Sequence, residues 1–216
     1  MKNNKLTIFN YSFFTTIIAI CIVLTIALRL NWLTLLSCIS GIFYIVFLSD
    51  RSVLNFIVGF ISSTTYIWVA YHAQLYGEVI FYLVIDLPMI FISFYMWKKN
   101  LDSTLRVSAR RMTHKQVILL VLCAIIAVVT YSFFLKAIGG RNYVVDAIST
   151  IVSFIATILM AKRYREQWFM WVVVYLVSVI MWSTTFDLLM LIMSSCCLIS
   201  CVIGYINWSK NSKAIR

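Results

Sequence analysis

Aromatic side chains recur along residues 168–182, the segment WFMWVVVYLVSVIMW, at a spacing that could form a ligand-binding surface. At 3.6 residues per turn, a helix face of roughly 80° carries four aromatic rings and one serine, from Trp168, Trp171, Tyr175, Ser178 and Trp182. Such a row suits a flat ligand with polar edges. A packing face with interfacial tryptophans at both ends, as bilayers favour, gives the same pattern. This segment alone leaves both interpretations open.

Asp86 is the acid that is hardest to explain as a solvated surface group. Of the seven acids, it alone falls near the middle of a long apolar segment, where an ionised carboxylate costs several kcal/mol unless it is paired or hydrated. One face of that segment, read as a helix, carries Tyr82, Asp86, Ile90, Ser93 and Trp97. Two interpretations stay open: a protonated carboxyl that hydrogen-bonds to a neighbouring helix, or a carboxylate that faces a cavity as the counter-charge of a cationic ligand.

Other reactive residue types do not form a pattern typical of an enzyme or a metal site. His72 and His114 are expected near opposite membrane surfaces, and no nucleophile is spaced to pair with either. Cys197 and Cys201 are one helical turn apart, but no His or acid is near them in sequence, which favours a packing role. No glycine-rich phosphate loop occurs. We therefore predict no enzyme activity, no cofactor and no metal.

The composition is that of an integral membrane protein. The chain of 216 residues is 63% hydrophobic and 12% charged, whereas soluble domains are about 45–50% apolar and about 25% charged. A single proline and few glycines argue against a β-barrel. The net charge of +11 could indicate nucleic-acid binding, but the basic residues lie in loops between apolar runs. We therefore expect a lipid bilayer around the chain and no nucleic-acid partner.

Eight apolar runs are long enough, or nearly so, to cross a hydrocarbon core of about 30 Å. They cover residues 7–28, 31–48, 53–75, 77–97, 116–138, 143–161, 168–186 and 187–207. The first run has no small-residue cleavage site and is followed by more spans, so we interpret it as an uncleaved helix. With the N-terminus inside, 15 of the 18 lysines and arginines fall on the cytoplasmic side. The sequence predicts an all-α protein of the cytoplasmic membrane with eight spans and both termini cytoplasmic.

The chain also repeats itself. Residues 37–51, SCISGIFYIVFLSDR, match residues 149–163, STIVSFIATILMAKR, at an offset of 112, and FYMWKKN at 94–100 matches YINWSKN at 205–211 at an offset of 111. Two parallel three-helix repeats joined by a connector helix would give this offset, with a ligand site near the midplane between them. We therefore divide the chain into an extra N-terminal helix (1–30), a first repeat (31–97), a basic loop with the connector helix (98–138), a second repeat (143–208) and a basic tail (209–216).

Several short motifs resemble those of the PnuC-type nicotinamide riboside (nicotinamide mononucleotide) transporters of bacteria. They are LYGE at 75–78, LPM at 87–89, MWKKN at 96–100, DAIST at 146–150 and MAKRYREQW at 160–168, followed by Trp171. They occur in the family's order across the third to eighth predicted helices. The resemblance implies a 3+1+3 bundle related to the SWEET fold and facilitated diffusion of a nucleoside-like vitamin. It also implies a cytoplasmic kinase that traps the substrate after entry.

The resemblance assigns Trp168 and Trp171 to the family's Trp-x-x-Trp substrate motif. Two positions depart from the family: Tyr175 stands where an asparagine is usual, and Ile90 stands where many members have glutamine, so two amides are missing. Trp and Tyr faces attract cations, and Asp86 would supply a counter-charge, so a pyridinium riboside and a thiazolium such as thiamin are both expected to fit. The predicted binding residues are Trp168, Trp171, Tyr175, Ser178, Trp182, Asp86, Tyr82, Ile90 and Ser93.

Two hypotheses therefore remain at the level of the sequence. The first is a vitamin transporter whose ligand is nicotinamide riboside or another cationic vitamin such as thiamin. The second is a membrane sensor or assembly protein that does not transport, because the amides that would recognise a ribose or carboxamide are missing. Substrate-dependent uptake separates the two. The sequence leaves open whether the chain forms a homo-oligomer.

Overall fold

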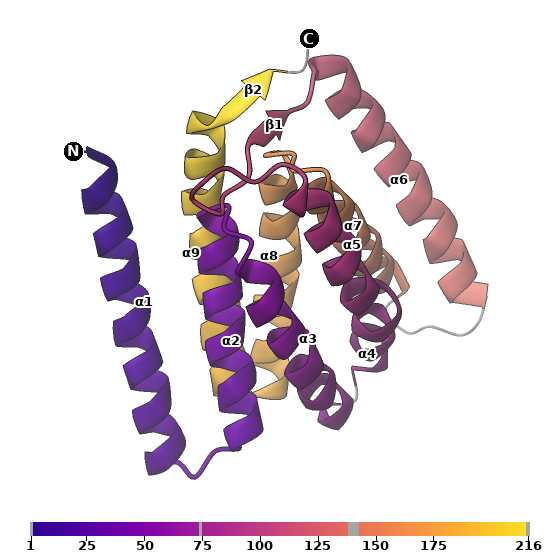
Figure 1. Ribbon diagram of the computed structural model, residues 1–216. Coiled ribbons are helices and arrows are strands. Elements are labelled where there is room, and N and C mark those ends of the chain that lie inside the picture. The colour runs from indigo at the N-terminus through magenta and orange to yellow at the C-terminus, as the bar shows by residue number, and fades with distance from the viewer. Residues whose placement is uncertain (1, 74, 138–142, 215–216) are drawn as a thin grey trace.

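The computed structural model describes residues 2–73, 75–137 and 143–214, and the chain there is almost entirely helical (Figure 1). The helices are α1 (Lys2–Ala27), α2 (Trp32–Ser49), α3 (Asn55–His72), α4 (Tyr76–Phe81), the π-helical turn η1 (Tyr82–Asp86), α5 (Leu87–Lys98), α6 (His114–Ala137), α7 (Tyr143–Ala161), α8 (Gln167–Thr185) and α9 (Leu188–Lys210). Every predicted apolar run coincides with one of these helices, except that α4, η1 and α5 divide the run 77–97. Residue 1 of the predicted N-terminal helix, residue 74 of the predicted run 53–75, residue 138 of the predicted connector and residues 215–216 of the predicted tail lie outside the described residues.

The helices form a multi-pass membrane protein. Within the described residues, five helices are long and apolar enough to span: Trp32–Ser49, Gly77–Lys98, His114–Phe134, Gln167–Thr184 and Leu188–Lys210. Ser12–Ala27 and Ala147–Ala161 are shorter apolar helices. Large apolar side chains on α6, such as Ile126 and Phe133, are exposed, and a surface of this kind suits lipid far better than water.

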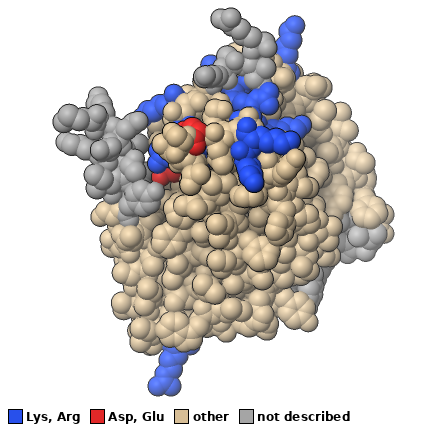
Figure 2. Space-filling view, viewed as in Figure 1, with Lys and Arg blue, Asp and Glu red and all other residues tan. Residues whose placement is uncertain are grey.

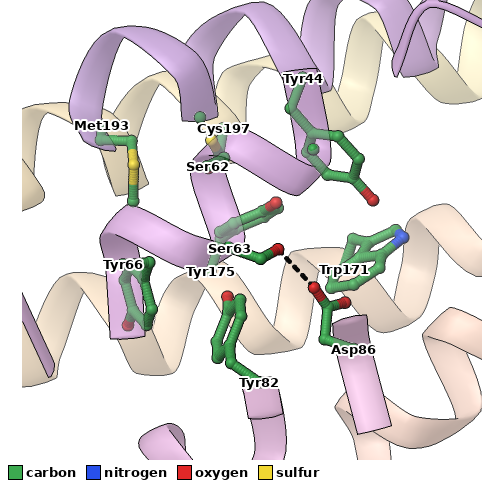
Figure 3. Close-up of a pocket in the computed structure, with 12 residues that line it drawn as sticks. Tyr44, Ser62, Ser63, Tyr66, Tyr82, Asp86, Trp171, Tyr175, Met193 and Cys197 are labelled. Carbon is green, nitrogen blue, oxygen red and sulfur yellow. Dashed lines mark hydrogen bonds between the residues drawn. The ribbon is translucent and has the colours of Figure 1, made fainter. Parts of the chain in front are cut away.

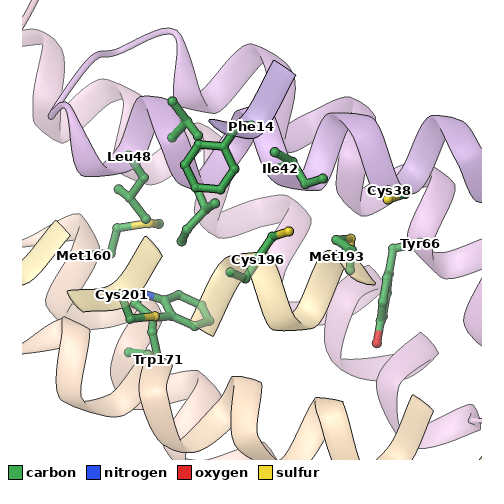
Figure 4. Packing of buried hydrophobic residues seen from close by; sticks show 14 of the residues in the cluster. Phe14, Cys38, Ile42, Leu48, Tyr66, Met160, Trp171, Met193, Cys196 and Cys201 are labelled. Atoms are coloured by element: carbon green, nitrogen blue, oxygen red, sulfur yellow. The ribbon is translucent and has the colours of Figure 1, made fainter. Parts of the chain in front are cut away.

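The bundle is arranged around α2, α8 and α9. The helix α9 packs against both α2 and α8, α3 packs on α2, and α7 lies between α6 and α8 (Figure 1). Figure 4 shows the apolar packing between α2 and α9, where Ile42 and Cys196 are both buried. The first helix joins this core through the buried Phe14 and through Cys21, whose sulfur lies 3.9 Å from that of Cys38 on α2.

The π-helical turn η1 interrupts what the sequence predicts as one continuous helix. The Leu87 N–H donates to the Tyr82 carbonyl, five residues back, where an α-helix would bond four back. Pro88 follows directly, and a proline has no N–H to donate and its ring collides with the carbonyl four residues earlier. The widened turn accommodates this ring. It also determines how Tyr82 and Asp86 are presented to the interior, and such turns are frequent at functional sites.

A small parallel sheet lies at the end of the bundle where α5 and α9 finish. The strand β1 (Ala109–Arg111) pairs with β2 (Ser212–Ala214), with Ala109 opposite Ser212. The expectation of a purely α chain missed these strands because each is three residues long, and the pairing satisfies backbone groups of a loop and a tail that the apolar pattern does not address. Figure 2 shows lysines and arginines gathered at this end, hereafter the basic end.

The first helices of the two predicted repeats, α2 and α7, end in the same way. Arg51 has a φ of 61° and Arg163 a φ of 64°, and both values lie in the left-handed region that non-glycine residues rarely adopt. The Arg51 N–H donates to the Leu48 carbonyl at 3.0 Å, and the Arg163 N–H donates to the Met160 carbonyl at 2.9 Å. Both arginines also contact the loop before α6. The Arg51 guanidinium donates to the Val107 carbonyl at 2.8 Å, and the Arg163 guanidinium donates to the Ser108 hydroxyl oxygen at 3.2 Å.

Candidate ligand-binding site

A cavity of about 40 Å³ lies in the middle of the bundle between α2, α3, η1, α8 and α9. We call it the central cavity. Its described lining is Gly41, Tyr44, Gly59, Ser62, Ser63, Tyr66, Tyr82, Asp86, Trp171, Tyr175, Met193 and Cys197. The close-up in Figure 3 shows Asp86, Tyr82, Trp171 and Tyr175 pointing toward one another from η1 and α8. Helices far apart in the sequence thus bring four of the predicted residues together.

Asp86 supplies the carboxyl group of the central cavity. The residue is 9% exposed, and its Oδ2 accepts a hydrogen bond of 2.5 Å from the Ser63 hydroxyl on α3 (Figure 3). None of the twelve described lining residues is Lys, Arg or His. A carboxylate that is buried without a cation is costly, so a positively charged ligand in this cavity would be stabilised by Asp86.

Two rings on α8 form a platform beside this carboxyl group. Trp171 and Tyr175 are one turn apart, and their rings stack with centroids 5.9 Å apart and planes at 27°. The indole Nε1 of Trp171 donates to the Gln167 side-chain oxygen at 3.4 Å, which orients the ring. Aromatic faces carry negative charge density, so the platform and Asp86 favour the same kind of ligand, a flat cation.

A second group of rings closes the other side of the central cavity. Tyr66 on α3 lies against Tyr82 with ring centroids 4.5 Å apart, and it meets Trp182 edge-on at 5.8 Å. The sequence reasoning found Tyr82 and Trp182 but missed Tyr66, together with Tyr44 on α2. Other aromatic residues accompany both missed tyrosines on their helices, so the sequence does not single out either tyrosine. Their place at the cavity depends on how α2 and α3 pack.

Two glycines allow side chains to approach the central cavity closely. A Cβ atom on Gly59 would lie 2.9 Å from the Tyr44 ring, and one on Gly41 would collide with the Met193 thioether. The Tyr44 ring and the Met193 thioether therefore occupy space that the side chain of any residue other than glycine at positions 59 and 41 would take. Met193 itself is unbranched and polarizable, a side chain that readily changes shape around a ligand.

The remaining predicted residues lie elsewhere. Trp168 is fully buried against Trp208, with ring centroids 6.1 Å apart, and a Cβ atom on Gly204 would fall on its indole. Ile90 and Ser93 are also buried but do not line the central cavity. Ser178 is half-buried and likewise absent from that lining. Trp182 belongs to another cavity.

This second cavity measures about 570 Å³ and lies at the end of the bundle opposite the basic end. We call it the outer vestibule, where outer means only the end of the bundle away from the basic end. Its described lining is Asn31, Thr34, Trp68, Val69, His72, Ala73, Trp182, Thr185 and Asp187. Asp187 begins α9, where its Oδ1 accepts from the Met190 N–H at 3.1 Å. Burial raises the pKa of Asp187 above its ordinary value, and backbone N–H groups of α9 partly oppose that shift.

Metal binding has no support in the described part of the chain. No group of three or more His, Cys, Asp or Glu side chains that could hold an ion occurs there. All six cysteines are free thiols, and five of them are buried. The polar groups that line the central cavity and the outer vestibule are mainly carboxyl groups, hydroxyl groups and aromatic rings, together with the Cys197 thiol and the His72 imidazole.

Comparisons of the sequence with known proteins agree on one family. The family model described as nicotinamide mononucleotide transporter matches residues 31–210. The nicotinamide riboside transporter PnuC of Neisseria mucosa is 32% identical over 191 residues, 83% of this chain and 73% of that protein. Its namesake from Haemophilus influenzae is 34% identical over 183 residues, 83% of this chain and 80% of that protein.

The fold agrees as well. A solved structure, described as the crystal structure of the vitamin B3 transporter PnuC, superposes with a TM-score of 0.86 at 30% sequence identity, covering 94% of this chain and 91% of that one. These relatives are transporters and not enzymes, which confirms the resemblance that the short motifs indicated. The chain belongs to the nicotinamide mononucleotide transporter family.

Proposed function

We propose that this chain carries nicotinamide riboside across the cytoplasmic membrane by facilitated diffusion, and that a cytoplasmic kinase traps the substrate by phosphorylation. The observation that carries this proposal is the meeting of the Asp86 carboxyl group with the Trp171–Tyr175 platform in one cavity. Both of these relatives bear the name of a nicotinamide riboside transporter, which supports the choice of ligand.

The chemistry of the ligand matches this lining. Nicotinamide riboside carries a flat pyridinium cation, and contact with Trp or Tyr rings contributes about 0.5–2 kcal/mol per pair. Asp86 supplies the counter-charge, and the hydroxyl groups of Ser62 and Tyr82 are available to the ribose. These contacts replace the amides that Tyr175 and Ile90 remove from the family's pattern.

Binding of a riboside requires the bundle to open. A cavity of about 40 Å³ holds little more than a water molecule, whereas ligand sites measure about 300–1,000 Å³. Two parallel three-helix repeats, α2 to α5 and α7 to α9, that rock about the central cavity would provide this opening. The 3+1+3 arrangement with α6 as connector and α1 as an addition is supported by the equivalent ends of α2 and α7. The family match beginning at residue 31 also supports it.

Orientation completes the proposal. The basic end is assigned to the cytoplasm, because cytoplasmic loops carry the excess of Lys and Arg. Both termini then lie inside, and the outer vestibule faces outward. An impermeant thiol reagent tests this with a single added cysteine at Ser103, in the loop between α5 and α6. Labelling of that cysteine from outside intact cells would overturn the orientation.

Uptake into vesicles tests the function. The purified full chain is reconstituted, and entry of labelled nicotinamide riboside down its gradient is compared with entry into empty vesicles. We expect faster entry that a protonophore does not change, as facilitated diffusion requires. Entry no faster than in empty vesicles would contradict the proposal and favour a non-transporting role. Stronger competition by unlabelled thiamin than by unlabelled nicotinamide riboside would identify a thiamin-like vitamin as the substrate.

A further inference from the structure

The outer vestibule is large enough to hold a ligand by itself. Its volume of about 570 Å³ compares with about 40 Å³ for the central cavity, and it lies within the range of about 300–1,000 Å³ typical of small-molecule sites. It is built from the start of α2, the end of α3, the end of α8 and the α8–α9 turn. Among the described residues, none lines both cavities.

The wall of the outer vestibule combines two indole rings with one carboxyl group. Trp68 and Trp182 supply the rings, and Asp187 supplies the carboxyl group. Trp68 is held by His72, whose ring centroid lies 4.0 Å away and whose Nδ1 is 2.9 Å from the Trp68 carbonyl oxygen. The described lining contains neither Lys nor Arg. A flat cation is therefore the ligand that this wall favours.

An aromatic pair separates the outer vestibule from the central cavity. Tyr66 lines the central cavity, Trp182 lines the outer vestibule, and the two rings meet edge-on at 5.8 Å and 84°. Their exposed fractions are 4% and 0%, so almost no solvent reaches the pair. Tyr82 backs the pair from η1, with its ring 4.5 Å from that of Tyr66.

We infer that the outer vestibule is a second binding site, which takes a flat cationic ring before the Trp182–Tyr66 pair parts and the ligand enters the central cavity. The identity of the ligand rests on the proposed function, whereas the preference for a cation rests on the vestibule's own residues. Trp182 then forms the inner end of this site, where the ligand reaches its ring as the pair parts, and it is not part of the platform that Trp171 and Tyr175 form.

Asp187→Asn isolates the charge of this site. Asparagine caps a helix as well as aspartate does, so the start of α9 is retained while the charge is removed. We expect the KM for nicotinamide riboside uptake to rise about fivefold, the upper end for a solvent-accessible ion pair, with an unchanged maximal rate. Glu78→Gln is the matched control, because Glu78 lies at the same end of the bundle but does not line the vestibule. Its KM should stay within about twofold of the unmodified protein.

Calorimetry with the 1-methylnicotinamide cation tests the site without transport. Trp171→Ala weakens ligand binding in the central cavity. We expect this variant to retain binding of the cation in the outer vestibule, and we expect the added Asp187→Asn substitution to remove that binding. Loss of all binding in Trp171→Ala alone, or equal binding with and without Asp187→Asn, would overturn the inference. If the unmodified protein binds the cation through Asp187 but takes up no riboside, the proposed function fails and the second site stands. If uptake is normal and Asp187→Asn changes neither KM nor binding, the second site fails alone.

Discussion

Trp97 and Trp208 make the same hydrogen bond from opposite halves of the chain. The Trp97 indole donates to the Met160 carbonyl at 3.0 Å, and the Trp208 indole donates to the Leu48 carbonyl at 2.9 Å. The two rings lie 5.9 Å apart. Met160 follows Leu48 by 112 residues and Trp208 follows Trp97 by 111, so each indole reaches the end of the other half's first helix. The pair joins the two halves at the basic end.

The two bonds predict matched effects on stability. Trp97→Phe and Trp208→Phe each keep a ring and lose the N–H donor, which costs about 1 kcal/mol. The Met160 and Leu48 carbonyls keep the bonds that they accept from the Arg163 and Arg51 N–H groups, so neither is left without a partner. We expect both variants to lower Tm in detergent by a similar amount, about 2–4 °C. Trp32→Phe serves as the control, because Trp32 is exposed on α2 and should change Tm little. A large loss in one variant with none in the other would show that the two bonds are not equivalent.

Trp168 and Trp171 should separate stability from binding. Trp168 is fully buried against Trp208, whereas Trp171 lines the central cavity. We therefore expect Trp168→Phe to lower Tm while the Kd for nicotinamide riboside changes less than threefold, roughly the effect of 0.6 kcal/mol. Trp171→Phe loses part of the platform and should weaken binding more than it lowers Tm. Calorimetry and thermal unfolding on the same preparations decide the matter, and equal weakening of binding by both changes would contradict the assignment.

Tyr175 tests how this chain manages without the family's asparagine. Tyr175→Phe keeps the ring that stacks on Trp171, so uptake should fall less than about threefold. Tyr175→Asn removes the ring and its contact with a cation, worth about 1 kcal/mol or more, so uptake should fall about fivefold or further. Initial uptake rates at a riboside concentration below KM measure both effects. Faster uptake by Tyr175→Asn would instead indicate that the natural ligand is a different vitamin.

The extent of the helices follows from the sequence because a bilayer demands apolar segments of a defined length. The predicted runs 143–161 and 168–186 therefore fall within a residue of α7 and α8. The turn η1 was not predicted, since the run 77–97 is uniformly apolar and Pro88 alone does not say whether a helix will kink, end or widen. The β1–β2 pairing depends on where the α5–α6 loop and the tail meet in space, which no local pattern encodes.

The sequence predicted which face of α8 points into the bundle, but not what each residue of that face contacts. Helix periodicity puts Trp168 and Trp171 on one face of α8, and both side chains do point inward. A face carries no information on what lies opposite each turn: Trp208 lies opposite Trp168, and the central cavity lies beside Trp171. Ser63 could have been found through the repeat, because Tyr175 occupies the equivalent position 112 residues later. Cys197 likewise occupies the position equivalent to Asp86, 111 residues later.

The central claim is that Asp86 stabilises a cationic riboside in the central cavity. The most direct measurement compares the Kd values of nicotinamide riboside and its neutral, reduced form for the unmodified protein and for Asp86→Asn, with Asp50→Asn as a control at the basic end. Breaking a buried charge pair costs about 3–5 kcal/mol, so Asp86→Asn should weaken the cation about a hundredfold or more. The neutral form should change less than about threefold, and Asp50→Asn should change neither. Equal Kd values for the cation in Asp86→Asn and the unmodified protein would contradict the account and leave Asp86 as a structural partner of Ser63.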